Sequence, residues 1–237
     1  MTTQTNVRQA QPDHPPRELR WHESVWPVYL AIIAALGLSM LIDPRLVFGD
    51  YWLMPLLGMI LLVPLISTRP RPVPQDWPPR RVLAIILIGL INASNIVSLI
   101  LLVRSMLQFG TARVGNEDLP GASLVVEAIK IWLVNILVFA LWFWELDRGG
   151  PSGRLRERPS EPDFLFPQMT ISPHLTIPHW RPTFVDYLFL SFTNATAFSP
   201  TDVLPLTPSA KLIMMVQALT SLLTIAFVAA RAVNILK

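Results

Sequence analysis

Residues Ser191 to Thr207 read SFTNATAFSPTDVLPLT, and they lie between two long apolar segments. A short amphipathic stretch leads into a turn rich in hydroxyl groups. The turn ends in Asp202-x-x-Pro205 and is followed by another apolar helix. Non-helical backbone is tolerated at membrane depth only where protein buries it or water reaches it. The stretch therefore predicts a re-entrant loop that builds a site inside a membrane.

The composition predicts an integral membrane protein. Of the 237 residues, 52% are hydrophobic and only 15% are charged, whereas a soluble domain carries about 25% charged residues. The apolar residues come in blocks, as transmembrane helices require. A net charge of +3 would suit nucleic acid, but the arginines lie in loops beside the apolar blocks, which indicates membrane topology and no nucleic-acid partner. The chain has no cysteine, which excludes disulfides and thiolate metal sites.

The blocks predict an all-α fold of about five transmembrane helices plus a short re-entrant helix. A disordered polar tail at 1–24 precedes a three-helix membrane region at 25–110, with spans near 25–42, 51–66 and 82–103. The second span is short for a bilayer. The region 122–237 is predicted to hold a helix at 124–146, a loop at 147–182, the re-entrant helix at 183–196, a turn at 196–205 and a last helix at 210–235.

The basic residues predict how the chain is oriented. Cytoplasmic loops carry an excess of Lys and Arg near the span ends. With the N-terminus inside, the inner side holds twelve such residues: Arg8, Arg17, Arg20, Arg69, Arg71, Arg80, Arg81, Arg148, Arg154, Arg156, Arg158 and Arg181. The outer side holds five: Arg45, Arg104, Arg113, Arg231 and Lys237. We therefore expect a multi-pass protein of the inner (plasma) membrane, with a cytoplasmic N-terminus and the re-entrant loop on the cytoplasmic face.

The re-entrant stretch carries part of a known channel motif, Ser-Phe-x-Thr-x-Thr-Thr-Val-Gly-Tyr-Gly-Asp-x-x-Pro. Aligned without a gap, the chain matches it at Ser191, Phe192, Thr196, Asp202 and Pro205. The C-terminal half thus resembles the two-helix pore domain of the potassium-channel superfamily, in particular its small bacterial members. The resemblance implies an outer helix at 124–146, a pore helix at 183–196, a filter-like turn, an inner helix at 210–235 and a homotetramer in the lipid bilayer.

The resemblance and the arginine count disagree about sidedness. Potassium channels place the filter on the outer face, whereas the arginines place this loop on the inner face. Two explanations remain open. In the first, the pore is inverted, as in glutamate-receptor channels. In the second, the number of spans is wrong by one, and the short second span is the one to remove.

The departures from the motif lie in the filter. Its Gly-Tyr-Gly is replaced by Ser199, Pro200 and Thr201. Glycines allow the positive φ angles with which successive carbonyls point at an ion, whereas Pro200 fixes φ near −65° and β-branched Thr201 resists positive φ. Potassium selectivity is therefore not expected. The filter-like turn consists of Thr196, Ala197, Phe198, Ser199, Pro200, Thr201 and Asp202.

Several polar residues are candidates for lining a pore, namely Thr193, Asn194, Gln217, Ser221 and Thr224. The last three share one face of the predicted inner helix. That face lines a pore in one interpretation and supplies interhelical hydrogen bonds in the other. Asp202 likewise has two interpretations, as an acidic ring that favours cations or as a local cap of its turn.

Other polar residues lie near span ends. Glu127 and Lys130 are three residues apart, which predicts an interfacial ion pair. Glu145 and Asp147 follow an aromatic cluster and are placed to contact the arginine-rich loop after them. The chain has no HExxH, GxSxG or Walker A motif, so no catalytic residue, metal site or cofactor is predicted.

Two function hypotheses follow. In the first, the chain is an oligomeric channel-like protein with a filter that does not select potassium and conducts cations passively. In the second, it is a non-conducting membrane scaffold or partner-binding protein that retains the channel-like fold.

Overall fold

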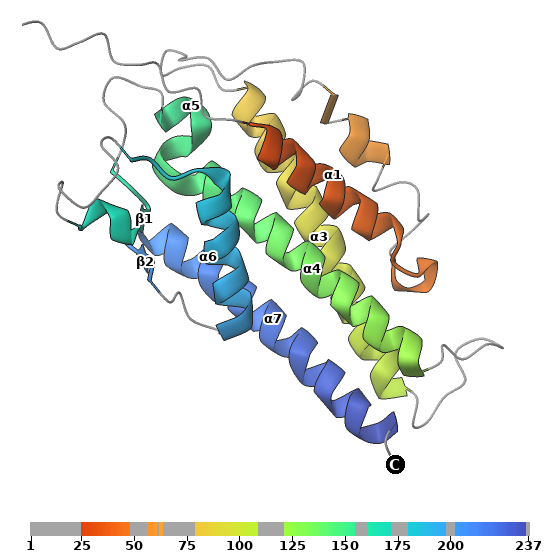
Figure 1. Cartoon of the computed structure of the whole chain (residues 1–237). Coiled ribbons are helices and arrows are strands. Elements are labelled where there is room, and N and C mark those ends of the chain that lie inside the picture. The colour runs from red at the N-terminus through yellow and green to blue at the C-terminus, as the bar shows by residue number, and fades with distance from the viewer. Residues whose placement is uncertain are drawn as a thin grey trace, which may run out of the picture.

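The fold is known from a computed structural model, which describes residues 25–47, 56–60, 62–63, 79–108, 121–154, 161–171, 180–197 and 202–235. The structure is a bundle of five main helices (Figure 1). These are α1 (Trp26–Met40), α3 (Pro79–Gln108), α4 (Gly121–Leu146), α6 (Phe184–Ala197) and α7 (Pro208–Ile235). The predicted second span at 51–66 falls largely outside the described residues; 56–60 and 62–63 are helical.

Helix α4 is the centre of the bundle. It packs against α1 and α3 on one side and against α6 and α7 on the other, and it runs antiparallel to α1, α3 and α7 (Figure 1). Its buried side chains include Val134, Val138, Phe139 and Phe143. A helix that is apolar around its whole circumference is expected in a position with neighbours on all sides.

Three helical ranges are long and apolar enough to cross a membrane, namely Arg81–Ser105, Ser123–Arg154 and Pro208–Ala230. They support the predicted membrane protein. Helix α1 is apolar but has 15 residues, or about 22 Å at 1.5 Å per residue, which is less than the ~30 Å hydrocarbon thickness.

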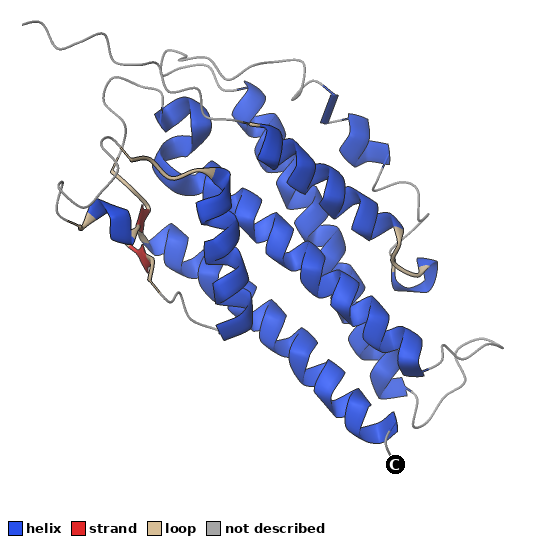
Figure 2. Ribbon diagram, viewed as in Figure 1, coloured by secondary structure: helices blue, strands red, loops and turns tan. Residues whose placement is uncertain are grey.

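Apart from α6, the described chain between α4 and α7 consists of short elements, and it contains the only strands of the described residues (Figure 2). After α4 come η2 (Asp147–Gly149), α5 (Gly150–Arg154), β1 (Phe164–Leu165) and η3 (Pro167–Met169), and β2 (Leu204–Pro205) precedes α7. Strand β1 pairs antiparallel with β2, with Phe164 opposite Pro205. The all-α prediction is wrong in this detail, because this short pairing joins the loop after α4 to the segment before α7.

The aromatic residues of this loop belong to the core. Phe164 and Phe166 are buried, and both stack edge-on against Tyr187 of α6, with ring centroids 6.5 and 5.4 Å away. The loop therefore covers the start of α6, which positions the short helix against α4.

Candidate functional site

The candidate site is built around α6, a helix of 14 residues. At 1.5 Å per residue it is about 21 Å long, too short to cross a bilayer. Its start is fixed by a reciprocal cap. The Asp186 carboxylate accepts hydrogen bonds from the Thr183 backbone N–H at 2.7 Å and from the Thr183 hydroxyl at 2.8 Å. A carboxylate in the first turn is also favoured by the helix dipole.

Helix α6 ends halfway down the bundle (Figure 1). The Asn194 amide, one turn from its end, donates to the Met214 carbonyl at 3.0 Å, and Met214 lies about 9 Å along α7 from its first residue. On the α4 side, the Phe192 ring lies 6.4 Å from the Trp132 ring. Trp132 is itself about 21 Å along α4 from the last residue of that helix, Leu146. The predicted re-entrant helix at 183–196 thus matches α6 within one residue at each end.

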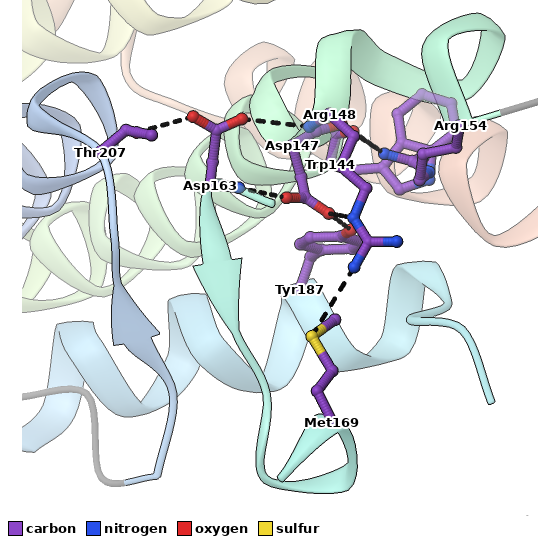
Figure 3. A network of polar contacts seen from close by, with 8 residues as sticks. All are labelled: Trp144, Asp147, Arg148, Arg154, Asp163, Met169, Tyr187 and Thr207. Carbon is purple, nitrogen blue, oxygen red and sulfur yellow. Dashed lines mark hydrogen bonds and ion pairs between the residues drawn. The ribbon is translucent and has the colours of Figure 1, made fainter. Parts of the chain in front are cut away.

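A buried carboxylate holds the start of α6 against the end of α4 (Figure 3). Asp147 is fully buried and accepts a hydrogen bond from the Tyr187 hydroxyl at 2.6 Å and from the Asp163 backbone N–H at 2.8 Å. The Arg148 Nε atom lies 3.9 Å from the same carboxylate. A buried charge of this kind is tolerated because it is paired and hydrogen-bonded.

Asp163 extends the network to α7 (Figure 3). Its carboxylate accepts from the Thr207 hydroxyl at 2.6 Å and from the Arg148 backbone N–H at 3.0 Å. The Thr207 oxygen in turn accepts from the Ala210 backbone N–H at 3.3 Å, so Thr207 caps the amino end of α7. The ends of α4, α6 and α7 are therefore joined through two aspartates.

The turn after α4 allows this geometry. Arg148, Gly149 and Gly150 all have positive φ angles, of 54°, 76° and 79°. A β-carbon at Gly150 would lie 2.8 Å from a Glu145 carboxylate oxygen, so the turn requires glycine there.

Arg154 fills the space behind the turn. It is buried, donates to the carbonyls of Trp144 at 2.8 Å and Asp147 at 3.1 Å, and lies over the Trp144 and Tyr187 rings. Glu145 pairs with Arg81 of α3 at 3.7 Å. Asp147 contacts Arg148 of the loop that follows it, as predicted, whereas Glu145 pairs with Arg81 of α3 and not with an arginine of that loop.

A second polar layer lies halfway along α6. The Gln217 amide donates to the Ser191 hydroxyl at 2.6 Å and to the Ser191 carbonyl at 2.9 Å, and it accepts from Asn194 at 2.8 Å. The Ser191 hydroxyl donates to the Ile136 carbonyl of α4 at 2.7 Å. These hydrogen bonds connect α6 to α4 and to α7 within one copy of the protein.

One turn further along α7, the Asn135 amide donates to the Ser221 hydroxyl at 2.8 Å. Thr224 is also buried, and its hydroxyl donates to the Thr220 carbonyl of its own helix. Of the five candidate lining residues, Asn194, Gln217, Ser221 and Thr224 are thus buried within the chain. Asn194, Gln217 and Ser221 make hydrogen bonds between helices, as one of the two interpretations expects. Thr193 is half-buried and bonds its own helix.

The filter-like turn is only partly described. Thr196 and Ala197 end α6 and are exposed, and Asp202 is exposed before β2. Phe198, Ser199, Pro200 and Thr201 lie outside the described residues. The structure therefore brings the two ends of the turn to one side of the bundle, next to α6 and the start of α7.

The remaining predicted pair lies at the other end of α4. Lys130 donates to Glu127 at 2.7 Å and to the Leu41 carbonyl at the end of α1 at 2.6 Å, which confirms the ion pair. Glu127 also accepts from the Asp43 backbone N–H at 3.1 Å. The pair holds the carboxyl end of α1.

Sequence reasoning missed the link between Asp147, Asp163, Tyr187 and Thr207. Tyr187 is followed by apolar residues, and its sequence context predicts only that it belongs to the re-entrant helix. A tyrosine on the buried face of a membrane helix needs a partner for its hydroxyl group, and that requirement was the available signal.

Within the described residues there is no group of three or more His, Asp or Glu side chains that could hold a metal ion. Comparisons of the chain with models of protein families, with curated proteins and with solved structures find no match.

Proposed function

We propose that this chain forms an oligomeric membrane pore that conducts cations passively and does not select potassium. The proposal rests above all on α6, a half-length helix that stops at the middle of the bundle. The last four carbonyls of a helix have no partner within it. In hydrocarbon such groups are tolerated only where protein covers them or water reaches them.

The carboxyl end of α6 suits a cation. Aligned peptide dipoles give this end a partial negative charge, and α6 directs it to the middle of the bundle. The exposed Thr196 lies in its last turn, and the exposed Asp202 lies five residues after its last residue, Ala197. A hydrated path next to this end would therefore favour cations over anions.

The exposed face of α6 supports an assembly of several copies. Val185, Phe189 and Phe192 are exposed at spacings of four and three, and Thr196 continues the same face one turn on. A polar hydroxyl at this depth is best placed against other protein or water. By resemblance to two-helix channels, we propose a homotetramer with these faces towards its axis.

The hydroxyl-rich turn determines which ion is expected. Ser199, Pro200 and Thr201 replace the glycines that let carbonyls surround a dehydrated ion. A hydrated pathway that discriminates weakly among monovalent cations agrees with this backbone chemistry.

For orientation we propose five spans, including the short α1 and the chain around 56–63, in the inner membrane. The arginine excess places the N-terminus and the turn on the cytoplasmic side. This orientation puts Lys237 outside the cytoplasm. A reporter that is active only outside the cytoplasm should therefore be active when fused after Lys237. Activity of a reporter that works only in the cytoplasm would contradict the orientation.

The alternative is a non-conducting scaffold that keeps this fold. Its support is the burial of Gln217, Ser221 and Thr224, which are occupied by contacts within the chain. A protein whose inner-helix polar groups hold its own helices together has fewer groups left to line a path.

Flux measurements on pure protein in liposomes test the proposal. We expect sodium and potassium to cross at similar rates, and Asp202→Asn to reduce cation flux several-fold because it removes a carboxylate from the mouth of the turn. Glu161→Gln is the matched control, since Glu161 is also an exposed carboxylate but lies in the loop before β1. No flux at any voltage, pH or membrane tension would leave the scaffold as the function.

A further inference from the structure

The surface where α3 meets α4 contains polar groups that neither α6 nor the proposed pore explains. Along α3, the residues Leu87, Ile91, Asn95, Ser98 and Leu102 are all buried at spacings of three and four. Such spacing places them on one face. Asn95 lies in the middle of this face, and its side chain is 98% buried.

The facing surface of α4 contains a second buried amide. Leu124, Ala128, Ile131 and Asn135 share a face of α4, and the first three belong to the same buried cluster as Leu99 and Leu102 of α3. These two faces therefore pack together in the bundle.

The antiparallel register brings the two amides to one level. Near one end of the contact, a β-carbon added at Gly89 would lie 3.9 Å from the Trp142 ring. Because this contact is made by the tip of the Trp142 side chain, it sets the register of the two helices to within about one turn, and Asn95 and Asn135 therefore lie within about one helical turn of the same level.

Both amides have atoms without a protein partner. The Asn95 Oδ1 and Nδ2 atoms and the Asn135 Oδ1 atom are buried and make no hydrogen bond within the protein. The Asn135 Nδ2 atom is used, since it donates to Ser221. Buried polar groups without partners are costly, above all at membrane depth, so these three atoms require a ligand.

The chemistry of the three atoms identifies that ligand. Two are acceptors and one is a donor. A cation would satisfy the oxygens but would leave the Asn95 amide N–H groups unpaired. Water both donates and accepts, makes about three hydrogen bonds when buried, and is small enough for an enclosed position.

We propose that Asn95 and Asn135 together hold at least one ordered water molecule between α3 and α4. The site is connected to α7, because Asn135 also bonds Ser221, one turn from Gln217, which holds α6. The bound water thus joins the N-terminal helices to the unit that contains α6. This site does not depend on conduction.

Water-edited solid-state NMR on the full chain in bilayers tests the site. With asparagine side chains labelled with ¹⁵N, magnetisation transferred from water should reach the Asn95 amide several-fold faster than the Asn194 amide. Asn194 is the matched control, since it is equally buried but donates to two protein acceptors, Gln217 and the Met214 carbonyl. Transfer to Asn95 no faster than to Asn194 would overturn the proposal.

Two variants test whether the amides share the water. Asn95→Leu removes both partner atoms, so it should slow the transfer from water to the Asn135 amide several-fold and lower the unfolding midpoint. Asn95→Ser supplies a hydroxyl that can still bond water, so it should retain most of the transfer from water to the Asn135 amide. It also provides a test of the site if the leucine variant does not fold. Unchanged transfer to Asn135 in the leucine variant, or loss of transfer in the serine variant, would exclude a shared water site.

Discussion

At the scale of single residues, Asp147 connects three segments of the described chain. Its carboxylate is fully buried at the end of α4 and meets a tyrosine hydroxyl, a backbone N–H and an arginine. The three partners come from α6, from the residue before β1 and from the neighbouring position in η2. One side chain therefore fixes how three segments approach one another.

Replacement of Tyr187 by phenylalanine tests this constraint. Tyr187→Phe retains the ring stacking but leaves the buried Asp147 carboxylate without its shortest hydrogen bond. We expect the free energy of unfolding to fall by about 1–3 kcal/mol, measured as a lower thermal midpoint in lipid nanodiscs. Thr170→Val is the control, because the Thr170 hydroxyl bonds only the nearby Pro167 carbonyl at an exposed position. Equal midpoints for the two variants would show that the hydroxyl contributes little.

At the scale of elements, the sequence predicted the long helices well and the turn contacts poorly. The boundaries of α4, α6 and α7 lie within three residues of those predicted, because long apolar runs flanked by Pro, Gly and charged residues define helices locally. The pairing of β1 with β2 and the contact between Asp147 and Tyr187 join residues 40 apart. The approach of Asp147 to Tyr187 also follows a turn with three consecutive positive φ angles, which hydrophobic periodicity does not predict.

The candidate site was predictable to the same extent. The position of α6 follows from its own sequence. The burial of Gln217 and Ser221 does not, because one polar face can be directed either to an axis or to neighbouring helices, and only tertiary packing decides between them.

Alanine substitutions at two glycines should change the free energy of unfolding in opposite directions, and they test how the elements pack. A β-carbon at Gly153 in α5 would overlap the Arg148 carbonyl oxygen, whereas one at Gly37 in α1 would meet nothing within 4 Å. We expect Gly153→Ala to cost about 1–3 kcal/mol because the backbone must move. Gly37→Ala should be neutral or stabilising by up to about 1 kcal/mol, since alanine favours helix. Thermal midpoints that shift in the same direction would contradict this account of α5.

At the scale of the whole molecule, α7 and the outer face of α6 expose many of their large apolar side chains, whereas a larger share of α4 is buried. A single copy would expose these faces, together with Thr196, to lipid. An assembly around α6 and α7 would cover them and would leave α1 and α3 at its periphery.

Because the chain has no cysteine, a single introduced one reports on this assembly directly. In a homotetramer with α6 towards the axis, Thr196→Cys should form disulfide-linked dimers rapidly in native membranes under mild oxidation. Leu30→Cys, at an exposed position on α1, is the control and should remain monomeric on a denaturing gel. Cross-linking at Leu30→Cys but not at Thr196→Cys would place the contact between copies on the wrong side for a pore.

The central position of α4 also bears on how the protein is made. The Asn135 amide and the Ile136 carbonyl are paired with Ser221 of α7 and Ser191 of α6, which leave the ribosome long after α4 has entered the bilayer. The Asn135 side-chain amide of a nascent chain thus has no partner in lipid until translation is nearly complete. A stop codon placed before α7 should therefore yield a product that membrane proteases degrade rapidly, whereas loss of only the last few residues should leave its lifetime unchanged.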